Sequence, residues 1–190
     1  MTLSHYLPNI SIRYRFFPVI SIITRLKRLN FSKINNFMAL FLSKFINKID
    51  KKGRVSVPAQ FRAALNNENF AGIIIYESFI NDCIEGCDIS RIAKISESID
   101  DLDPFSEERD AFATTVLGSS IQLPFDGDGR VILPDHLRKF AIIDDQALFV
   151  GKGATFEIWQ PQKFENYAKK AKQEALKMRK TLKLSKKEAQ

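Results

Sequence analysis

Residues 50–62 read DKKGRVSVPAQFR, and residues 126–138 repeat this stretch without a gap as DGDGRVILPDHLR, beginning 76 residues later. Both copies keep the opening Asp, the Gly-Arg-Val core, the Pro and the closing Arg. A repeat at a fixed offset indicates two similar structural units. The chain is therefore expected to contain one module twice.

The similarity extends beyond the motif, because GIIIY at 72–76 corresponds to ALFV at 147–150, and CIEGC at 83–87 corresponds to TFEIW at 155–159. Apolar runs of this length are typical of buried strands. Partly alternating apolar residues precede each motif, at 41–49 and 120–125. Each copy therefore predicts a strand, a tight turn, a short strand, a helical turn and two further strands.

Each motif also predicts how its turn and helix begin. Asp can bond its own downstream backbone, Gly tolerates a positive φ, and Pro suits the first position of a helix, where no N–H is needed. Short helices are expected at 59–65 and 135–140. Three residues in each copy are assigned structural roles: Asp50, Gly53 and Pro58, and Asp126, Gly129 and Pro134.

Helical segments are expected outside the repeats. Residues 89–99 and 106–116 predict two helices with a break at Pro104, and Pro161 opens a long helix with one apolar face. That face covers either its own sheet or a second subunit. The expected divisions are a basic extension at 1–37, a first repeat at 38–88, a helical insertion at 89–117, a second repeat at 118–160, and a C-terminal helix and basic tail at 161–190.

The chain carries a formal net charge of +7 at pH 7, which favours an anionic partner. Residues 1–37 lack acidic side chains and are interpreted as an upstream extension before Met38, with a transit peptide or a DNA-binding arm as alternatives. Cys83 and Cys87 are expected to be reduced thiols, since no histidine lies nearby in sequence to complete a zinc site. We expect no metal, no cofactor and no membrane span.

The two D-x-x-G-R motifs, Gly151 after an apolar strand, and FEIW at 156–159 resemble the MraZ family over about residues 38–170. This resemblance implies an α+β fold of tandem AbrB-like swapped-hairpin modules that form a pseudo-twofold barrel with peripheral helices. It also implies ring-shaped homo-oligomers in the cytoplasm and nucleoid. Their expected role is transcription regulation, through direct DNA repeats upstream of a division and cell-wall gene cluster.

The turn of the first repeat is the predicted contact with double-stranded DNA. Arg54 follows a rigid glycine turn, and its planar guanidinium can grip phosphate or the guanine edge. The alternative is that Arg54 pairs with Asp50 and holds the hairpin. The predicted DNA-binding residues are Arg54 and the surrounding Lys48, Lys51 and Lys52, with Arg130 of the second repeat as the weaker candidate.

The second turn differs, because Gly127 and Asp128 replace the lysine pair of the first, so it either contacts DNA weakly or contributes to the oligomer. An enzyme with a small-molecule substrate is not expected, since Gly151-Lys-Gly lacks the spacing of a phosphate-binding loop. Two other functions stay open: an antitoxin-like AbrB protein that also binds a partner protein, and a nonspecific architectural DNA binder.

Overall fold

The structure is a computed structural model that describes residues 40–65 and 70–181; the expected extension at 1–37 and the end of the tail lie outside the described residues. The first repeat and the helices after it comprise β1 (Lys44–Lys48), β2 (Arg54–Ser56), α2 (Ala59–Ala64), β3 (Gly72–Glu77), β4 (Ile84–Cys87), α3 (Ile89–Asp100), α4 (Glu107–Phe112) and the π-helical turn η1 (Ala113–Leu117). The rest comprises β5 (Ile121–Pro124), β6 (Arg130–Ile132), α5 (Asp135–Ala141), β7 (Gln146–Gly151), β8 (Phe156–Trp159) and α6 (Pro161–Lys177).

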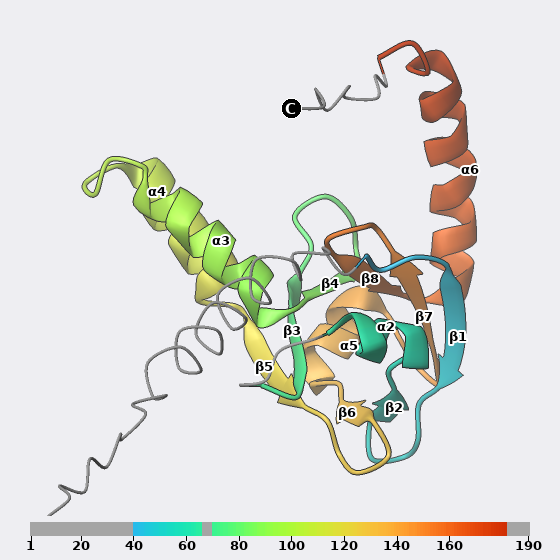
Figure 1. Ribbon diagram of the computed structural model, residues 1–190. Coiled ribbons are helices and arrows are strands. Elements are labelled where there is room, and N and C mark those ends of the chain that lie inside the picture. Colours follow the sequence, from blue (N-terminus) through green and yellow to red (C-terminus); the bar gives the residue numbers. More distant parts are fainter. Residues whose placement is uncertain (1–39, 66–69, 182–190) are drawn as a thin grey trace, which may run out of the picture. The chain divides into compact units, whose positions relative to one another are not determined.

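The strands form one six-stranded antiparallel sheet in the order β1-β7-β8-β4-β3-β5, and a separate two-stranded ribbon of β2 and β6 (Figure 1). Strands are exchanged between the repeats: β1 of the first pairs with β7 of the second, and β5 of the second pairs with β3 of the first. Neither repeat therefore completes its own strand pairing.

Equivalent positions of the two repeats meet where β4 pairs with β8 and where β2 pairs with β6. Glu85 lies opposite Glu157 in the sheet, and Val55 lies opposite Val131 in the ribbon. An antiparallel pair with equivalent residues at its centre has local twofold symmetry. The two copies are thus related by a pseudo-twofold arrangement.

The expected α+β fold is found, but the swapped-hairpin pseudo-twofold barrel is not confirmed, because among the described residues the six-stranded sheet is open and has β1 and β5 as its edges. The physical reason lies in the direction of the two edge strands. Each runs on into its turn and then into the ribbon, and Ile49 after β1 already bridges to Val55 of β2. Beyond each edge strand the backbone closes its own turn, from Asp50 N–H to Arg54 C=O at 3.0 Å and from Asp126 N–H to Arg130 C=O at 2.9 Å.

The core lies between the sheet and the ribbon with its two short helices, and an aromatic cluster from both repeats fills it. Phe61 of α2 is 1% exposed. Its ring contacts Phe41 and Phe45 of its own repeat edge-on, at centroid distances of 5.3 and 5.6 Å. It also contacts Phe149 and Phe156 of the other repeat, at 6.3 and 5.3 Å. Phe61 therefore joins the two copies through packing.

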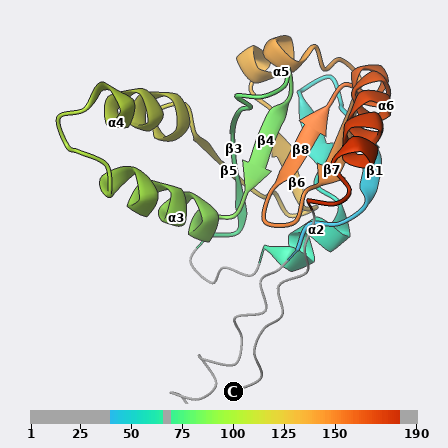
Figure 2. The same cartoon turned by 90° about the horizontal axis from the view of Figure 1, so that it is seen from above.

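The other face of the sheet carries helices at its two flanks. The hairpin of α3 with α4 and η1 covers the β3–β4 side, and α6 covers the β7–β8 side (Figure 2). The helix expected at 106–116 is regular only to Phe112 and continues as η1. The apolar face of α6 covers its own sheet only near the start, where Phe164 is buried, while Leu176 is exposed.

Both cysteines are free and buried, and burial raises the pKa of Cys83 and of Cys87 to about 12, so neither thiol is activated. Among the described residues, no group of side chains has the composition of a metal site. No helix in this part of the chain is long and apolar enough to cross a membrane.

Replacing Phe61 with Ala removes a side chain that both repeats contact. We expect the Phe61→Ala variant to lose about 3–5 kcal/mol of unfolding free energy, because the buried ring leaves a cavity. Urea denaturation followed by circular dichroism measures the loss. Phe79→Ala is the control, since Phe79 is 54% exposed and should change stability by about 0.5 kcal/mol or less. Equal losses in the two variants would contradict this account of the core.

Candidate nucleic-acid interface

The first D-x-x-G-R turn is held by its aspartate. Asp50 accepts hydrogen bonds through Oδ1 from the backbone N–H groups of Lys52 and Arg54, at 2.8 and 2.9 Å. Its Oδ2 accepts from Nε of Arg54 at 2.7 Å, and Nη2 lies at the same distance. One carboxylate therefore fixes both the backbone of the turn and the direction of the Arg54 side chain.

The second turn repeats this arrangement and adds one ion pair. Asp126 accepts from the backbone of Asp128 and Arg130 at 2.9 Å, and from Nε of Arg130 at 2.8 Å. In addition, Nη2 of Arg130 lies 2.6 Å from Oδ2 of Asp128. Arg130 is thus paired with two carboxylates, whereas Arg54 is paired with one.

The hydrogen bonds to the aspartates change their ionisation. The backbone N–H of Arg130 lowers the pKa of Asp126 to about 2, and the guanidinium of Arg130 acts in the same direction. The pKa of Asp50 is lowered for the same leading cause, the backbone N–H of Arg54. A lowered pKa means that the pairing stabilises each turn at pH values above the ordinary aspartate range, and that this contribution is lost as the pH falls through the lowered pKa.

Each turn is also covered by an arginine of the other repeat, a feature that the sequence interpretation missed. Gly53 and Gly129 have φ values of 76° and 71° and are buried. Arg138 of α5 packs over Gly53, and Arg62 of α2 packs over Gly129 and donates to the carbonyl of Asp128 at 3.3 Å. The available signal was the closing arginine of the motif, which recurs in both copies.

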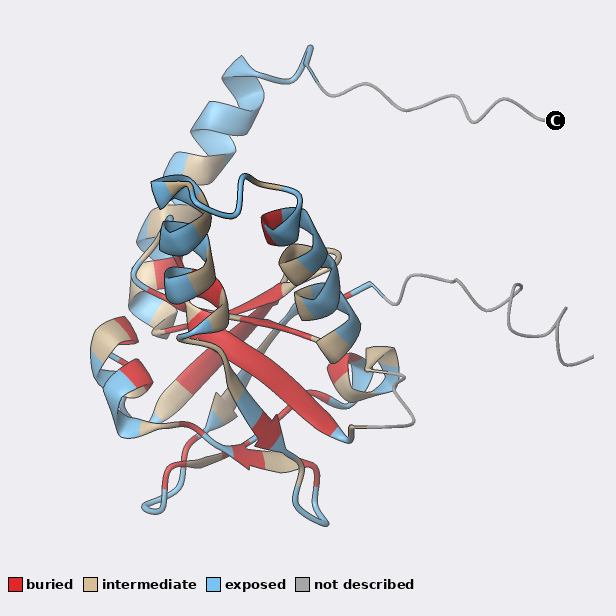
Figure 3. Cartoon of the chain, turned by 90° about the vertical axis from the view of Figure 1, so that its left-hand side faces the viewer, coloured by how far each residue is buried: buried red, intermediate tan, exposed pale blue. Residues whose placement is uncertain are grey.

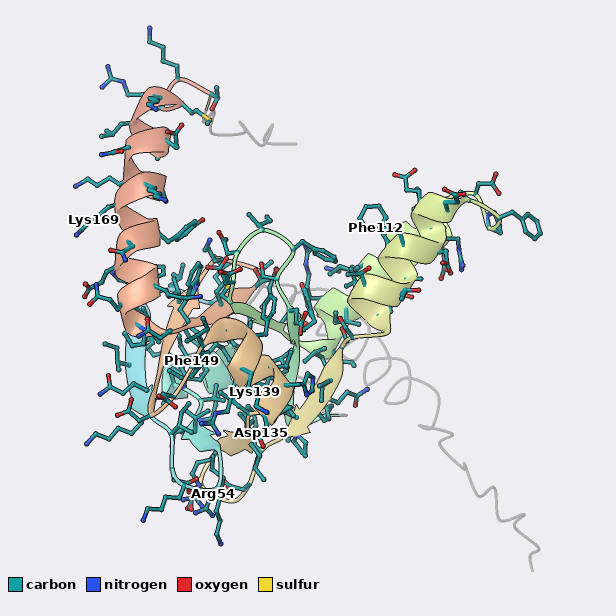
Figure 4. All side chains as sticks on the ribbon, turned by 180° about the vertical axis from the view of Figure 1, so that it is seen from behind. Arg54, Phe112, Asp135, Lys139, Phe149 and Lys169 are labelled. Carbon is teal, nitrogen blue, oxygen red and sulfur yellow. The ribbon has the colours of Figure 1, made fainter. Side chains whose placement is uncertain are left out.

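The ribbon sets the two turns side by side. Backbone hydrogen bonds cross between the repeats, from Val57 N–H to Gly129 C=O at 3.1 Å and from Leu133 N–H to Gly53 C=O at 3.0 Å. Both turns project as exposed loops from the same end of the described fold (Figures 1 and 3). Figure 4 places Arg54 at this end. The turns therefore form one two-pronged surface, which we call the turn surface.

The two prongs differ in charge. Residues 48–54 hold four basic side chains and one acidic side chain, which gives a net charge of +3. The equivalent residues 124–130 hold one basic and two acidic side chains, which gives −1. Lys48 at the end of β1 and Lys51 and Lys52 on the turn are all exposed, within six residues of Arg54 in sequence.

Comparison with known proteins matches the two halves of the chain separately to one family model. That model, described as "MraZ protein, putative antitoxin-like", matches residues 40–111 and again 116–185. The chain belongs to the MraZ family. The curated protein "Transcriptional regulator MraZ" of Rickettsia akari (strain Hartford) is 58% identical over 145 residues, which cover 76% of this chain and 97% of that protein.

Two further relatives with the same name agree. The protein of Rickettsia felis (strain ATCC VR-1525 / URRWXCal2) is also 58% identical over 145 residues, and that of Rickettsia bellii (strain OSU 85-389) is 59% identical over 146 residues. Each match again covers 76% of this chain and 97% of the relative. The resemblance to the MraZ family that the repeated motif indicates is confirmed.

The glycines of the two turns should differ in their tolerance of a side chain. A methyl group at Gly53 would meet only ordinary contacts, so Gly53→Ala should cost about 1–2 kcal/mol, for the positive φ alone. At Gly129 the same group would displace the guanidinium of Arg62, so Gly129→Ala should add to the cost of the positive φ the loss of the Arg62 bond to the carbonyl of Asp128. Urea denaturation of both variants measures the difference. Adding Arg62→Ala should bring the cost of Gly129→Ala down toward that of Gly53→Ala, and an unchanged cost would contradict the packing.

Proposed function

We propose that the protein is a sequence-specific DNA-binding regulator of transcription that meets double-stranded DNA through the turn surface. The charge of the first prong carries the proposal, because three exposed lysines surround an arginine whose direction is fixed. Lysines neutralise phosphates and set the register, and base contacts supply the sequence preference. The name shared by the curated relatives, "Transcriptional regulator MraZ", supports the regulatory role.

Arg54 is proposed as the residue that reads the sequence. Its ion pair with Asp50 uses Nε and one N–H of Nη2, which leaves the end of the guanidinium, with N–H groups of both Nη1 and Nη2, for a contact with DNA. An arginine held in this way loses little conformational freedom when it meets a base. A guanine O6 or N7 acceptor, or a phosphate oxygen, suits that edge.

The second prong is proposed to bind DNA more weakly. Asp128 adds a second carboxylate beside Arg130, and the prong carries a net negative charge that phosphate repels. Arg130 can still donate N–H groups of Nη1 to a neighbouring phosphate, since its two ion pairs use Nε and Nη2. The pseudo-twofold surface would therefore be used unequally, with the first repeat dominant.

The wider role follows from the family resemblance. We propose that the protein acts on nucleoid DNA in the cytoplasm as a ring-shaped homo-oligomer. Its operator would be a set of short direct repeats upstream of a division and cell-wall gene cluster. Several copies bound to several repeats would gain affinity through their linkage. A footprint with tandem protected repeats in that upstream region would support the operator, and no protection there would contradict it.

Arg54→Ala should abolish specific binding, while Arg130→Ala should weaken it less. If Arg54 reads guanine, removing each bidentate pair costs on the order of 1–3 kcal/mol of discrimination. Electrophoretic mobility shift or fluorescence anisotropy on the operator, against DNA of scrambled sequence, measures both affinity and specificity. Arg130→Ala is the matched control, because it breaks the same kind of turn pairing in the other repeat. If Arg130→Ala loses binding and Arg54→Ala does not, the assignment of the repeats is reversed.

Lys51→Ala and Lys52→Ala should act differently from Arg54→Ala. Each should weaken binding to operator and scrambled DNA alike, and should reduce the slope of log affinity against log salt by about 0.9 for each phosphate that is no longer neutralised. Titrations at several salt concentrations measure the slope. Lys139→Ala serves as the control, since Lys139 is an exposed lysine on α5 outside the turns. Unchanged slopes in both lysine variants would remove the first prong from the interface.

A further inference from the structure

A hollow beside the end of α5 is not used by the proposed function. Its volume is about 450 Å³, which lies within the range of small-molecule sites. The hollow, which we call the α5 pocket, is lined by residues of α5 and of the segment after it: Asp135, Arg138, Lys139, Ile142, Ile143 and Asp144. Figure 4 shows Lys139 and Asp135 on α5, with Asp135 nearer to the end of the fold that carries Arg54.

Ile142, which lines the α5 pocket, has a backbone conformation that suits a different residue. It follows the last residue of α5 with φ 56° and ψ 40°, the left-handed region that glycine or asparagine usually occupies at the end of a helix. Ser43 and Ile142 are the two described residues other than glycine with a positive φ, and Ile142 is the β-branched one. A β-branched side chain is strained in this region.

The rest of the fold does not explain an isoleucine at position 142. The N–H groups of Ile142 and Ile143 donate to the C=O groups of Lys139 and Arg138, at 3.2 and 2.8 Å, and a glycine could make the same bonds. The Ile142 side chain is 60% exposed, so it contributes little to the core. Residues held in strained conformations cluster at ligand-binding sites. Apolar contact with a ligand in the α5 pocket would account for this residue.

The charged side chains of the α5 pocket balance, since Arg138 and Lys139 are basic and Asp135 and Asp144 are acidic. Asp135 lies 3.5 Å from Nη1 of Arg138. Lys139 and Asp144 are exposed, and their side chains have no hydrogen bond or ion pair with another described residue. A simple anion or cation would meet as many like charges as opposite ones. A ligand with both a carboxylate and an ammonium group can pair with both kinds.

We propose that the α5 pocket binds an apolar α-amino acid. The carboxylate of the amino acid pairs with Lys139 and Arg138. Its ammonium group pairs with Asp135 and Asp144, and its side chain packs on Ile142. This ligand uses every charged group of the pocket and covers the exposed isoleucine.

Arg138 connects the α5 pocket with the first turn. Its guanidinium packs over Gly53, with Nη1 3.5 Å from the place of a Cβ atom, and Nη2 donates to the C=O of Asp144 at 3.1 Å. A carboxylate in the pocket would draw the guanidinium away from Gly53, so the turn that carries Arg54 would be held less firmly. The amino acid and operator DNA would then weaken each other's binding, because such coupling is reciprocal. This coupling rests on the proposed function, whereas the binding of the amino acid does not.

Isothermal titration calorimetry of the full chain without DNA tests the pocket. The probes are L-leucine, L-methionine and L-phenylalanine, each with its amide, which lacks the carboxylate, and its deaminated acid, which lacks the ammonium group. At least one amino acid should bind, and its two analogues should bind about tenfold more weakly or less, because each has lost a charged hydrogen-bonding group. No binding by any of the three, or equal binding by an analogue, would overturn the proposal.

Two variants place the ligand in the α5 pocket. Lys139→Ala should weaken the binding of the amino acid about tenfold, while Lys172→Ala, which removes an exposed lysine of α6, should keep the parent affinity. Ile142→Gly should also weaken binding, yet raise the midpoint of thermal unfolding by about 2–4 °C, because the strain of the positive φ is relieved. Weaker binding in a more stable protein cannot result from loss of folding. Parent affinity in Lys139→Ala or in Ile142→Gly would contradict the site.

Fluorescence anisotropy on operator DNA then tests the coupling. A concentration of the amino acid that saturates the parent but not Lys139→Ala should lower the operator affinity of the parent at least twofold and leave that of the variant unchanged. An unchanged parent would overturn the coupling. Weaker operator binding by Lys139→Ala without the amino acid would overturn the proposal, because the pocket would then belong to the DNA interface. If the parent does not bind operator DNA, the proposed function fails, and calorimetry alone still decides the pocket.

Discussion

The exchange of strands between the repeats is the constraint on which the rest of the structure depends. Because β1 pairs with β7 and β5 pairs with β3, neither repeat can form its sheet alone. The same exchange brings β2 beside β6 in a ribbon whose inward residues, Val55 and Val131, are almost completely buried. Burial of the ribbon fixes the two turns at its ends, so the position of the turn surface follows from the core.

The turns are rigid for reasons that act at three levels. Within the turn, Asp50 satisfies two backbone N–H groups that would otherwise face water. The same carboxylate also pairs with the guanidinium of Arg54 and fixes the direction of that side chain. Arg138, from the other repeat, packs over Gly53 of the turn. A residue held before binding loses less conformational entropy on contact with a ligand. This preorganisation would give the ion pair of Arg54 with Asp50 a part in the DNA recognition that we propose.

The two turns have the same backbone hydrogen bonds to their aspartates and differ in charge. The pairings of Asp126 with Arg130 repeat those of the first turn almost atom for atom. The second turn has Gly127 and Asp128 where the first has Lys51 and Lys52, and all four residues are exposed. The hydrogen bond to the turn aspartate comes from the backbone N–H of Lys52 or Asp128, so it does not depend on the side chain at that position.

The sequence by itself determined the repeat, the turns, the order and approximate bounds of the strands and helices, and the family. These features depend on local rules: positive φ at glycine, Asp bonding to its own backbone, and apolar runs of strand length. Tertiary structure alone decided which strands pair, that the sheet stays open rather than closing into a barrel, and that Arg62 and Arg138 cross to the opposite turns. It also decided that only the start of α6, near Phe164, lies on its own sheet. These outcomes depend on contacts between residues far apart in the chain, which a local pattern does not encode.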